Sequence, residues 1–490
     1  MSVDPLSRYE VVIGLEVHTQ LRTESKLFCG CRVRYGDDPN HHACPVCLAL
    51  PGALPVLNAR AVEFGVRTAL VMNCTVHPHS VFARKNYFYP DLPKGYQISQ
   101  YEEPLATKGW IEIDGEEPGG RSFAKRVGIT RIHMEEDAGK SIHDAAVTGR
   151  HGSHVDLNRA GVPLLEIVSE PDMRSPAEAG AYLRTLRQLL RYVDVSDADM
   201  EKGHFRCDAN VSLRTKGDTE FGTRNEIKNL NSFRFVEDAI RSEIERQARV
   251  LDDGGRIIQA TRLYDATTGK TRVMRTKENA DDYRYFPDPD LVPLGLETAL
   301  VERARLTLPE LPERRRIRLE SEHGLSAYDA RLLSMSRSLA DFFEAVVSAR
   351  VPAKLAANWI LRDVLQALKE REQEIEETKL TPEALAALLH LLEEGRLTTK
   401  SARELLPELV SRGGDPVELV SKRGLEAVSD SAEIERAADE VLAAHPENAQ
   451  RYRAGEEKIL NFLMGQVMKK TSGKASPGVV RDILARKLKA

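Results

Sequence analysis

The chain has 490 residues, a formal net charge of −5 and 30% charged residues, a composition typical of a water-soluble protein. This length exceeds what one hydrophobic core ordinarily serves, so we expect about two to four domains. No run approaches the ~18 apolar residues of a membrane span, and the start MSVDPLSRYE lacks the apolar centre of a signal peptide. These features exclude a membrane segment and predict a cytoplasmic protein.

The first predicted element is a strand over residues 9–20, YEVVIGLEVHTQ. Because side chains alternate across a strand, the odd-numbered apolar residues from Val11 to Val17 share one face. The other face carries Glu16, His18 and Gln20. A solvated sheet surface explains such a polar row as well as a functional site does, and the strand alone leaves both open.

Four of the six cysteines follow as a C-x-C and a C-x-x-C pair: Cys29, Cys31, Cys44 and Cys47. Disulfides suit small secreted domains, whereas two tight cysteine pairs separated by a polar loop are typical of a structural zinc site. His41 and His42 are possible substitute ligands, although four thiolates already complete a tetrahedral site. A set of ordinary reduced cysteines is the alternative.

Three later segments are predicted strands that carry a carboxylate in an unusual place. In residues 129–141, ITRIHMEEDAGKS, Glu136 continues the apolar row of Ile132 and Met134. In residues 162–171, VPLLEIVSEP, Glu166 interrupts an apolar run. Burying an unpaired carboxylate is costly, so such a group must pair with a cation, bind a metal or become protonated.

The third of these segments, residues 204–214, alternates along its whole length as HFRCDANVSLR. Asp208 falls on its polar face, and Cys207 falls on its apolar face, where a buried thiol is a small hydrophobic group rather than a nucleophile. Singly, each acid is more often part of a salt bridge. Taken together, Glu16, His18, Glu136, Glu166 and Asp208 form an oxygen-rich set that suits Mg²⁺ shared with substrate phosphates.

Two tripeptides suggest a phosphate-binding P-loop, Gly139-Lys140-Ser141 and Gly269-Lys270-Thr271. That motif also needs a glycine five residues before its second glycine, and these positions are Met134 and Tyr264. Both P-loops are therefore excluded. Residues 228–232 precede a helix-like segment and could place its N-terminus against phosphate, with an ordinary N-cap as the alternative.

From Leu306 onward nearly every segment has helical periodicity. In residues 380–395, LTPEALAALLHLLEEG, Pro382 suits the first helical turn and Gly395 the stop. Its stripe of Leu385, Leu388, Leu389 and Leu392 is predicted core. The glycines and proline of residues 407–416, PELVSRGGDP, resemble a junction between helical units.

The end of the chain is basic: from residue 458 onward there are eight Lys or Arg residues and one acid, Asp482. Seven of these are candidate polyanion-binding residues: Lys469, Lys470, Lys474, Arg481, Arg486, Lys487 and Lys489. Because no aromatic residues are interleaved to stack on bases, contact with phosphates is the available mode. A solvated helix face is the alternative.

Seven motifs in order resemble the B-subunit family of the bacterial glutamyl/aspartyl-tRNA amidotransferase. They are GLEVHTQL, FARKNYFYPDLPKGYQISQ, HMEEDAGKS, DLNRAGVPLLEIVSEPD, RCDANVSL, EIKNLNSF and DDYRYFPDPDL. The resemblance implies a complex with an amidase A subunit and a small C subunit. It also implies that the B subunit uses ATP and Mg²⁺ to phosphorylate the side-chain carboxylate of Glu-tRNA(Gln) or Asp-tRNA(Asn). Ammonia channelled from the amidase then displaces the phosphate, and a non-discriminating aminoacyl-tRNA synthetase is a further implied partner.

The resemblance also implies residue roles. Metal ligands fall on His18, Glu136 and Glu166, with Glu16 and Asp208 at a second, nearby cation position. Lys85 is implied at the gate of the ammonia channel. The four cysteines match a zinc-bearing branch of the family, in which zinc braces the fold.

The predicted fold class is α+β. The expected parts are a cradle domain around a mixed or antiparallel sheet at residues 1–295 with a zinc insert at 29–47, an all-α domain at 296–408, and an all-α tail at 409–490. The alternative function is a tRNA-binding scaffold without chemistry. A self-contained amidase is disfavoured because no Gly-Ser-rich nucleophile loop is present.

Overall fold

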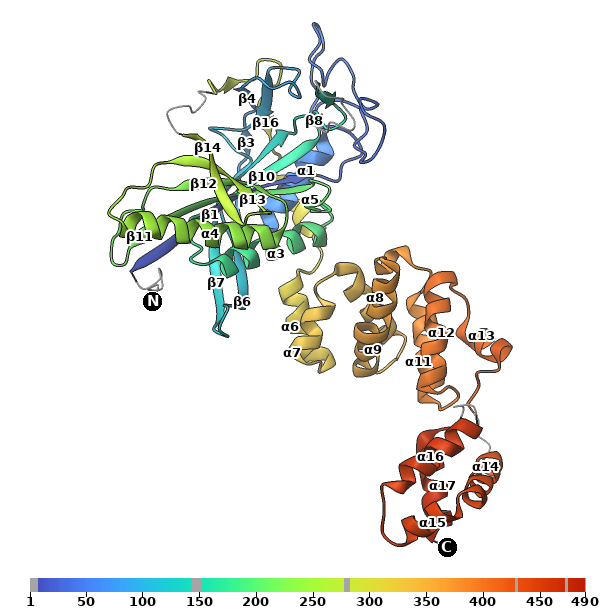
Figure 1. The fold of residues 1–490 in the computed structure, drawn as a ribbon. Coiled ribbons are helices and arrows are strands. Elements are labelled where there is room, and N and C mark those ends of the chain that lie inside the picture. The colour runs from blue at the N-terminus through green and yellow to red at the C-terminus, as the bar shows by residue number, and fades with distance from the viewer. Residues whose placement is uncertain (1–7, 143–151, 277–282, 428–430, 472–474, 490) are drawn as a thin grey trace. The chain divides into compact units, whose positions relative to one another are not determined.

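The computed structural model describes residues 8–142, 152–276, 283–427, 431–471 and 475–489 (Figure 1). The chain divides into two compact units, Met1–Leu311 and Pro312–Ala490. Strands and helices build the first unit, and helices build the second. The predicted α+β class is confirmed. Across the described residues, no helix combines the length and apolarity needed to cross a membrane.

A mixed sheet of nine strands forms the centre of the first unit, in the order β14-β13-β12-β11-β1-β10-β7-β6-β2. Neighbouring strands are antiparallel except β12 and β13, which are parallel. The strands are β1 (Tyr9–Gln20), β2 (Thr75–Val76), β6 (Ala106–Glu116), β7 (Ser122–Glu136), β10 (Pro163–Ser169), β11 (Phe205–Thr215), β12 (Asn225–Leu230), β13 (Ala260–Asp265) and β14 (Lys270–Thr276).

Helices cover one face of this sheet. They are α1 (Ala59–Val71), α3 (Pro176–Tyr192) and α4 (Phe233–Asp252), and Figure 1 shows α3 and α4 lying against the strands. The apolar row of β1 packs beneath them, with Ile13, Leu15 and Val17 fully buried in the same core as residues of all three helices. Because side chains alternate, Glu16 and His18 point to the opposite face.

Three smaller sheets flank the large one. They pair β4 (Ala83–Asn86) with β5 (Tyr96–Ser99) and β15 (Phe286–Pro287), β3 (His79–Ser80) with β16 (Leu294–Gly295), and β8 (Lys140–Ile142) with β9 (His154–Asp156). Strand β5 lies beside the end of β7, because the side-chain amide of Gln97 donates to the Glu136 carbonyl at 2.7 Å. This contact brings β4 and its Lys85 close to the polar face of the sheet.

The helical part of the chain begins with α5 (Thr298–Leu306), which still belongs to the first unit. The helices of the second unit are α6 (Pro312–His323), α7 (Ala327–Leu333), α8 (Arg337–Ser348), α9 (Ala353–Trp359), the π-helical turn η3 (Ile360–Val364), α10 (Leu365–Arg371), the 3₁₀ turn η4 (Ile375–Glu377), α11 (Pro382–Glu393), α12 (Thr399–Arg412), α13 (Pro416–Arg423), α14 (Ser431–Ala444), α15 (Pro446–Arg453), α16 (Ile459–Lys470) and α17 (Pro477–Lys489). Two apolar cores hold them, one drawn from residues 319–425 and one from residues 434–488.

The cores do not divide at the expected positions 295 and 408. Ala304 of α5 is buried in the core of the first unit, and Val420 of α13 is buried in the same core as Leu405 of α12. The glycines at 413 and 414 end α12, with φ of 70° at Gly413, but the chain after them returns to the core it has just left. The glycines therefore mark the end of a helix, not the end of a domain.

Helix α11 forms as its sequence predicts. The Thr381 hydroxyl accepts a hydrogen bond from the Ala384 amide, Pro382 occupies the first turn, and Gly395 takes the left-handed conformation just beyond the end. Leu385, Leu388 and Leu389 are fully buried, and Leu392 is partly buried.

Candidate metal centres

The face of the sheet opposite the helices gathers polar side chains from four adjacent strands. In the pairing of β1 with β10, His18 lies opposite Glu166, and in the pairing of β10 with β7, Glu166 lies opposite His133. On the other side of β1, Glu16 lies opposite Asp208 of β11. Directly paired residues of antiparallel strands share a face, so this register assembles the site.

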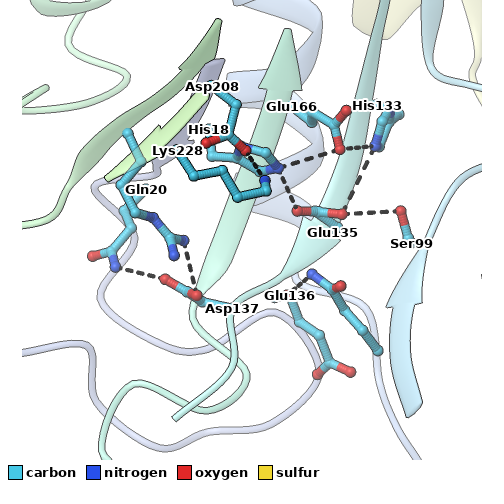
Figure 2. Close-up of polar contacts among 12 residues, drawn as sticks. His18, Gln20, Ser99, His133, Glu135, Glu136, Asp137, Glu166, Asp208 and Lys228 are labelled. Atoms are coloured by element: carbon cyan, nitrogen blue, oxygen red, sulfur yellow. Dashed lines mark hydrogen bonds and ion pairs between the residues drawn. The ribbon is translucent and has the colours of Figure 1, made fainter. Parts of the chain in front are cut away.

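His18, Glu135 and Glu166 form the centre of this face (Figure 2). Their ligand atoms all lie within 4.8 Å of one another. The His18 Nε2 atom is 3.3 Å from Glu166 Oε2 and 3.5 Å from Glu135 Oε1, and the Ser99 hydroxyl donates to Glu135 Oε2 at 3.1 Å. One imidazole and two carboxylates at this spacing can hold a divalent cation.

His133 supports both carboxylates from the side. Its Nε2 atom lies 3.0 Å from Glu166 Oε2 and 3.8 Å from Glu135 Oε2. Burial opposes charge on this imidazole, but the two carboxylates raise the pKa of His133 to about 9. Burial likewise opposes ionisation of Glu166, yet His133 and His18 hold its pKa well below the usual range. The two imidazoles therefore favour the ionised form of Glu166 and Glu135, which is the form that can bind a cation.

Glu136 does not join this group, contrary to the expectation from the sequence. It lies opposite Pro163 in the register, on the helix-covered face, where its carboxylate pairs with Lys94 and accepts from the Ile98 amide at 3.0 Å. Figure 2 shows its side chain directed away from Glu135. The sequence signal for Glu135 was the polar row of Arg131, His133 and Glu135, which alternates with the apolar row that Glu136 continues.

Glu16 and Asp208 lie in a second group, beside the first. Lys228 of β12 pairs with Asp208 and with Glu226 Oε1 at 3.0 Å, and Asn210 donates to Glu16 at 2.9 Å. Burial and then the nearby carboxylates, Glu166 foremost, raise the pKa of Glu16. A cavity of about 200 Å³ opens next to this group, lined by Glu16, Glu226, Thr261, Arg224 and Arg275 among others.

Two further cations adjoin the centre. Lys85 on β4 lies 4.8 Å from the Tyr283 ring, and although burial opposes its charge, Glu135 foremost raises its pKa. Arg206, which the sequence did not single out, lies opposite His18 in the register and donates to Asp137 at 2.9 Å. Its side chain remains 40% exposed.

Residues 228–232 include the N-cap of α4. The Ser232 hydroxyl accepts from the Phe235 amide at 3.1 Å, so it is an ordinary N-cap of α4. The side-chain amide of Asn229 donates to the Tyr264 carbonyl at 3.0 Å. Cys207 is 3% exposed and lies in the apolar core, as predicted.

The four cysteines converge although they come from separate turns of an irregular loop. The sulfur atoms of Cys29, Cys31, Cys44 and Cys47 all lie within 4.8 Å of one another, the spacing that a tetrahedral tetrathiolate site requires. A hydrogen bond from the Cys29 thiol lowers the pKa of Cys47 to about 4, with Lys26 contributing. The His42 ring contacts Asp37 at 2.6 Å, away from the sulfur cluster.

The basic residues near the C-terminus are not all available to a ligand. Helix α14 places acids against them, so that Lys470 pairs with Glu440, Arg486 with Glu435, and Lys487 with Asp439 at 2.6 Å. Lys469 and Arg481 are exposed and make no ion pair within the described residues. Lys474 and the side chain of Lys489 lie outside the described residues.

Two protein families match this chain, and together they give its class. Residues 11–302 match the family described as the GatB/GatE catalytic domain, and residues 341–488 match the family described as the GatB domain.

Full-length relatives give the same result. The aspartyl/glutamyl-tRNA(Asn/Gln) amidotransferase B subunit of Solidesulfovibrio magneticus is 54% identical over 485 residues, which are 99% of this chain and 100% of the relative. The proteins of the same name from Geobacter sulfurreducens and Moorella thermoacetica are 53% and 54% identical, over 98% of this chain and 99% and 100% of the relatives. The chain belongs to the family of aspartyl/glutamyl-tRNA(Asn/Gln) amidotransferase B subunits, as its motifs indicated.

Proposed function

We propose that this chain activates the side-chain carboxylate of a mischarged tRNA, Glu-tRNA(Gln) or Asp-tRNA(Asn), by ATP- and Mg²⁺-dependent phosphorylation. Ammonia from a glutamine-hydrolysing A subunit then replaces the phosphate, which makes the complex a carbon–nitrogen ligase. The observation that carries the proposal is the convergence of His18, Glu135 and Glu166 from three strands onto one face.

The donor set fits magnesium. When bound, the ion would supply positive charge that offsets the negative charge of the phosphoryl group during its transfer. His18, Glu135 and Glu166 would hold one ion, and Glu16 and Asp208 a second. Glu226 lies in the same group as Asp208, because Lys228 contacts both.

The cations of the site suit its anionic substrates. A carboxylate that attacks a phosphoryl group must overcome repulsion between two anions, so positive groups at fixed positions favour the reaction. Lys85 and Arg206 adjoin the carboxylate cluster from two different strands, β4 and β11. In our proposal Arg206 orients phosphate or the substrate carboxylate, and Lys85 lies where ammonia enters. The cavity beside Glu16, with Arg224 and Arg275 on its wall, would receive part of the nucleotide.

The other expected partners belong to the same proposal. The four cysteines hold structural zinc, the small C subunit completes the complex in the cytoplasm, and a non-discriminating synthetase supplies the mischarged tRNA. The basic tail binds tRNA phosphates.

The test uses the assembled complex with mischarged tRNA, ATP and Mg²⁺. We expect tRNA-dependent ADP formation, which Glu166→Gln lowers by about 10²-fold or more, as loss of a single electrostatic stabiliser does elsewhere. Glutamine hydrolysis without tRNA should be unchanged in this variant. Glu102→Gln, at an exposed acid of the same unit, is the matched control. If Glu166→Gln forms ADP at the normal rate, Glu166 is only structural; if the wild-type complex forms no tRNA-dependent ADP, the scaffold alternative holds.

A further inference from the structure

Lys26 is a fully buried lysine at the base of the cysteine cluster, with 0% of its surface exposed. Its side-chain ammonium donates to the His42 carbonyl at 2.6 Å and to the Leu157 carbonyl at 3.3 Å. The third contact of the ammonium is the Cys47 sulfur at 3.6 Å. The backbone amide of Lys26 donates to the Cys31 carbonyl at 2.9 Å, so the residue contacts both cysteine pairs.

A buried ammonium needs a negative partner, because desolvation of a charge costs several kcal/mol that two carbonyl dipoles offset only in part. Among the contacts described for the Lys26 ammonium, the Cys47 sulfur is the group that can carry a full negative charge. Glu136 lines the small cavity next to Lys26, but it already pairs with Lys94. A metal-bound thiolate at Cys47 would supply the negative charge that the buried Lys26 ammonium needs.

We propose that the Lys26 ammonium is the charge-compensating hydrogen-bond donor of the zinc site, acting on the Cys47 thiolate. Four thiolates around Zn²⁺ carry an excess of negative charge, and a donor beside one sulfur withdraws electron density from it. Because the metal already keeps that sulfur deprotonated, the donor makes it a weaker nucleophile, so it reacts more slowly with electrophiles and zinc is released more slowly. Through the Leu157 carbonyl the same ammonium ties the cysteine loop to the segment that precedes β10. This inference rests on the zinc site proposed above.

The experiment compares the full-length wild type with Lys26→Met, which keeps the length of the side chain and removes its charge. Zinc content is measured by plasma mass spectrometry, and zinc release under iodoacetamide is followed with a coloured chelator. We expect about one zinc per chain in both proteins and release on the order of tenfold faster in the variant, as for other groups that support metal ligands. Lys216→Met, at an exposed lysine of the same unit, should release zinc at the wild-type rate.

A spectroscopic readout separates the electronic role from simple packing. In the cobalt-substituted protein, loss of the donor should move the thiolate-to-cobalt charge-transfer bands to lower energy, which a merely structural lysine would not do. Equal release rates and unshifted bands in a zinc-replete Lys26→Met protein would overturn the proposal. If Lys26→Met does not fold, Lys26→Leu, which also removes the donor, undergoes the same assays with the same criteria. A wild type without zinc would refute the zinc site itself, and the role of Lys26 with it.

Discussion

Glu135 and Glu136 are consecutive residues of β7, yet their carboxylates lie on opposite faces of the sheet. Glu135 meets His18 and Ser99 on the polar face, whereas Glu136 pairs with Lys94 on the helix-covered face. Comparing the same substitution at Glu135 and at Glu136 therefore tests which of the two carboxylates belongs to the proposed metal centre.

Glu135→Gln should weaken the binding of Mn²⁺, a spectroscopic substitute for Mg²⁺, by at least about tenfold, because it removes one anionic ligand of the centre. Glu136→Gln should leave the Mn²⁺ dissociation constant within about twofold. Electron paramagnetic resonance of free Mn²⁺ measures both constants. Equal weakening in the two variants would contradict the assignment of Glu135.

His133 should act as a positioning residue for Glu166 and Glu135. His133→Phe removes the donor 3.0 Å from Glu166 and should raise the Mg²⁺ concentration for half-maximal ADP formation by about tenfold, more than it lowers the rate at saturating Mg²⁺. His133→Gln retains an N–H donor and should recover part of the loss. A fall in the saturating rate with unchanged Mg²⁺ dependence would instead place His133 in the chemistry.

The zinc site should support stability and not the reaction. Replacing Cys44 and Cys47 together by serine should remove zinc and lower the melting temperature, because a structural metal contributes folding free energy. Mn²⁺ binding at the acidic centre should persist in the folded double variant. Cys74→Ala, at a buried cysteine outside the cluster, is the control that should keep its zinc. Retention of full zinc by the double variant would refute the assignment.

The tail should bind tRNA through its unpaired cations. Lys469→Ala with Arg481→Ala should weaken tRNA binding, each lost phosphate contact lowering the slope of log affinity against log salt by about 0.9. Arg486→Ala with Lys487→Ala should have the smaller effect, because Glu435 and Asp439 already pair with these residues. Filter binding at several salt concentrations measures both pairs. If tRNA affinity is unchanged in both double variants and in a chain truncated after residue 427, the tail is dispensable for tRNA binding.

The second unit should lose stability in acid through Glu344. Burial opposes ionisation of this carboxylate, but Arg315 at 3.0 Å and Arg318 at 2.6 Å lower its pKa. A lowered folded-state pKa means that the stabilisation is complete above the unfolded pKa of about 4.3 and is lost as pH falls through the folded pKa. Glu344→Gln should therefore cost about 1 kcal/mol at pH 7, and progressively less below pH ~4. Denaturant unfolding of the wild type and the variant, at pH 7 and again below pH ~4, measures this difference. A loss of unfolding free energy that is the same at both pH values would contradict the prediction.

Much of the centre was readable from the sequence because alternation within a strand depends only on local geometry. The polar row of β1, the buried Cys207, the clustering of the four cysteines and the capping of α11 all follow from residue order, and the structure bears them out. The seven family motifs could likewise be recognised from short stretches of sequence.

Only the tertiary structure decided which polar rows meet. Strand pairing sets Glu166 opposite His133, and so chooses Glu135 over Glu136. Long-range contacts bring Arg206 beside His18, bury Lys26 against Cys47, and lay the acids of α14 on the basic tail. The alternation of side chains along a strand, with its period of two residues, shows which side chains share a face of that strand. It cannot state which face the helices will cover, or which residue of a distant strand will lie opposite, because register and layer packing are set by contacts between segments far apart in the chain.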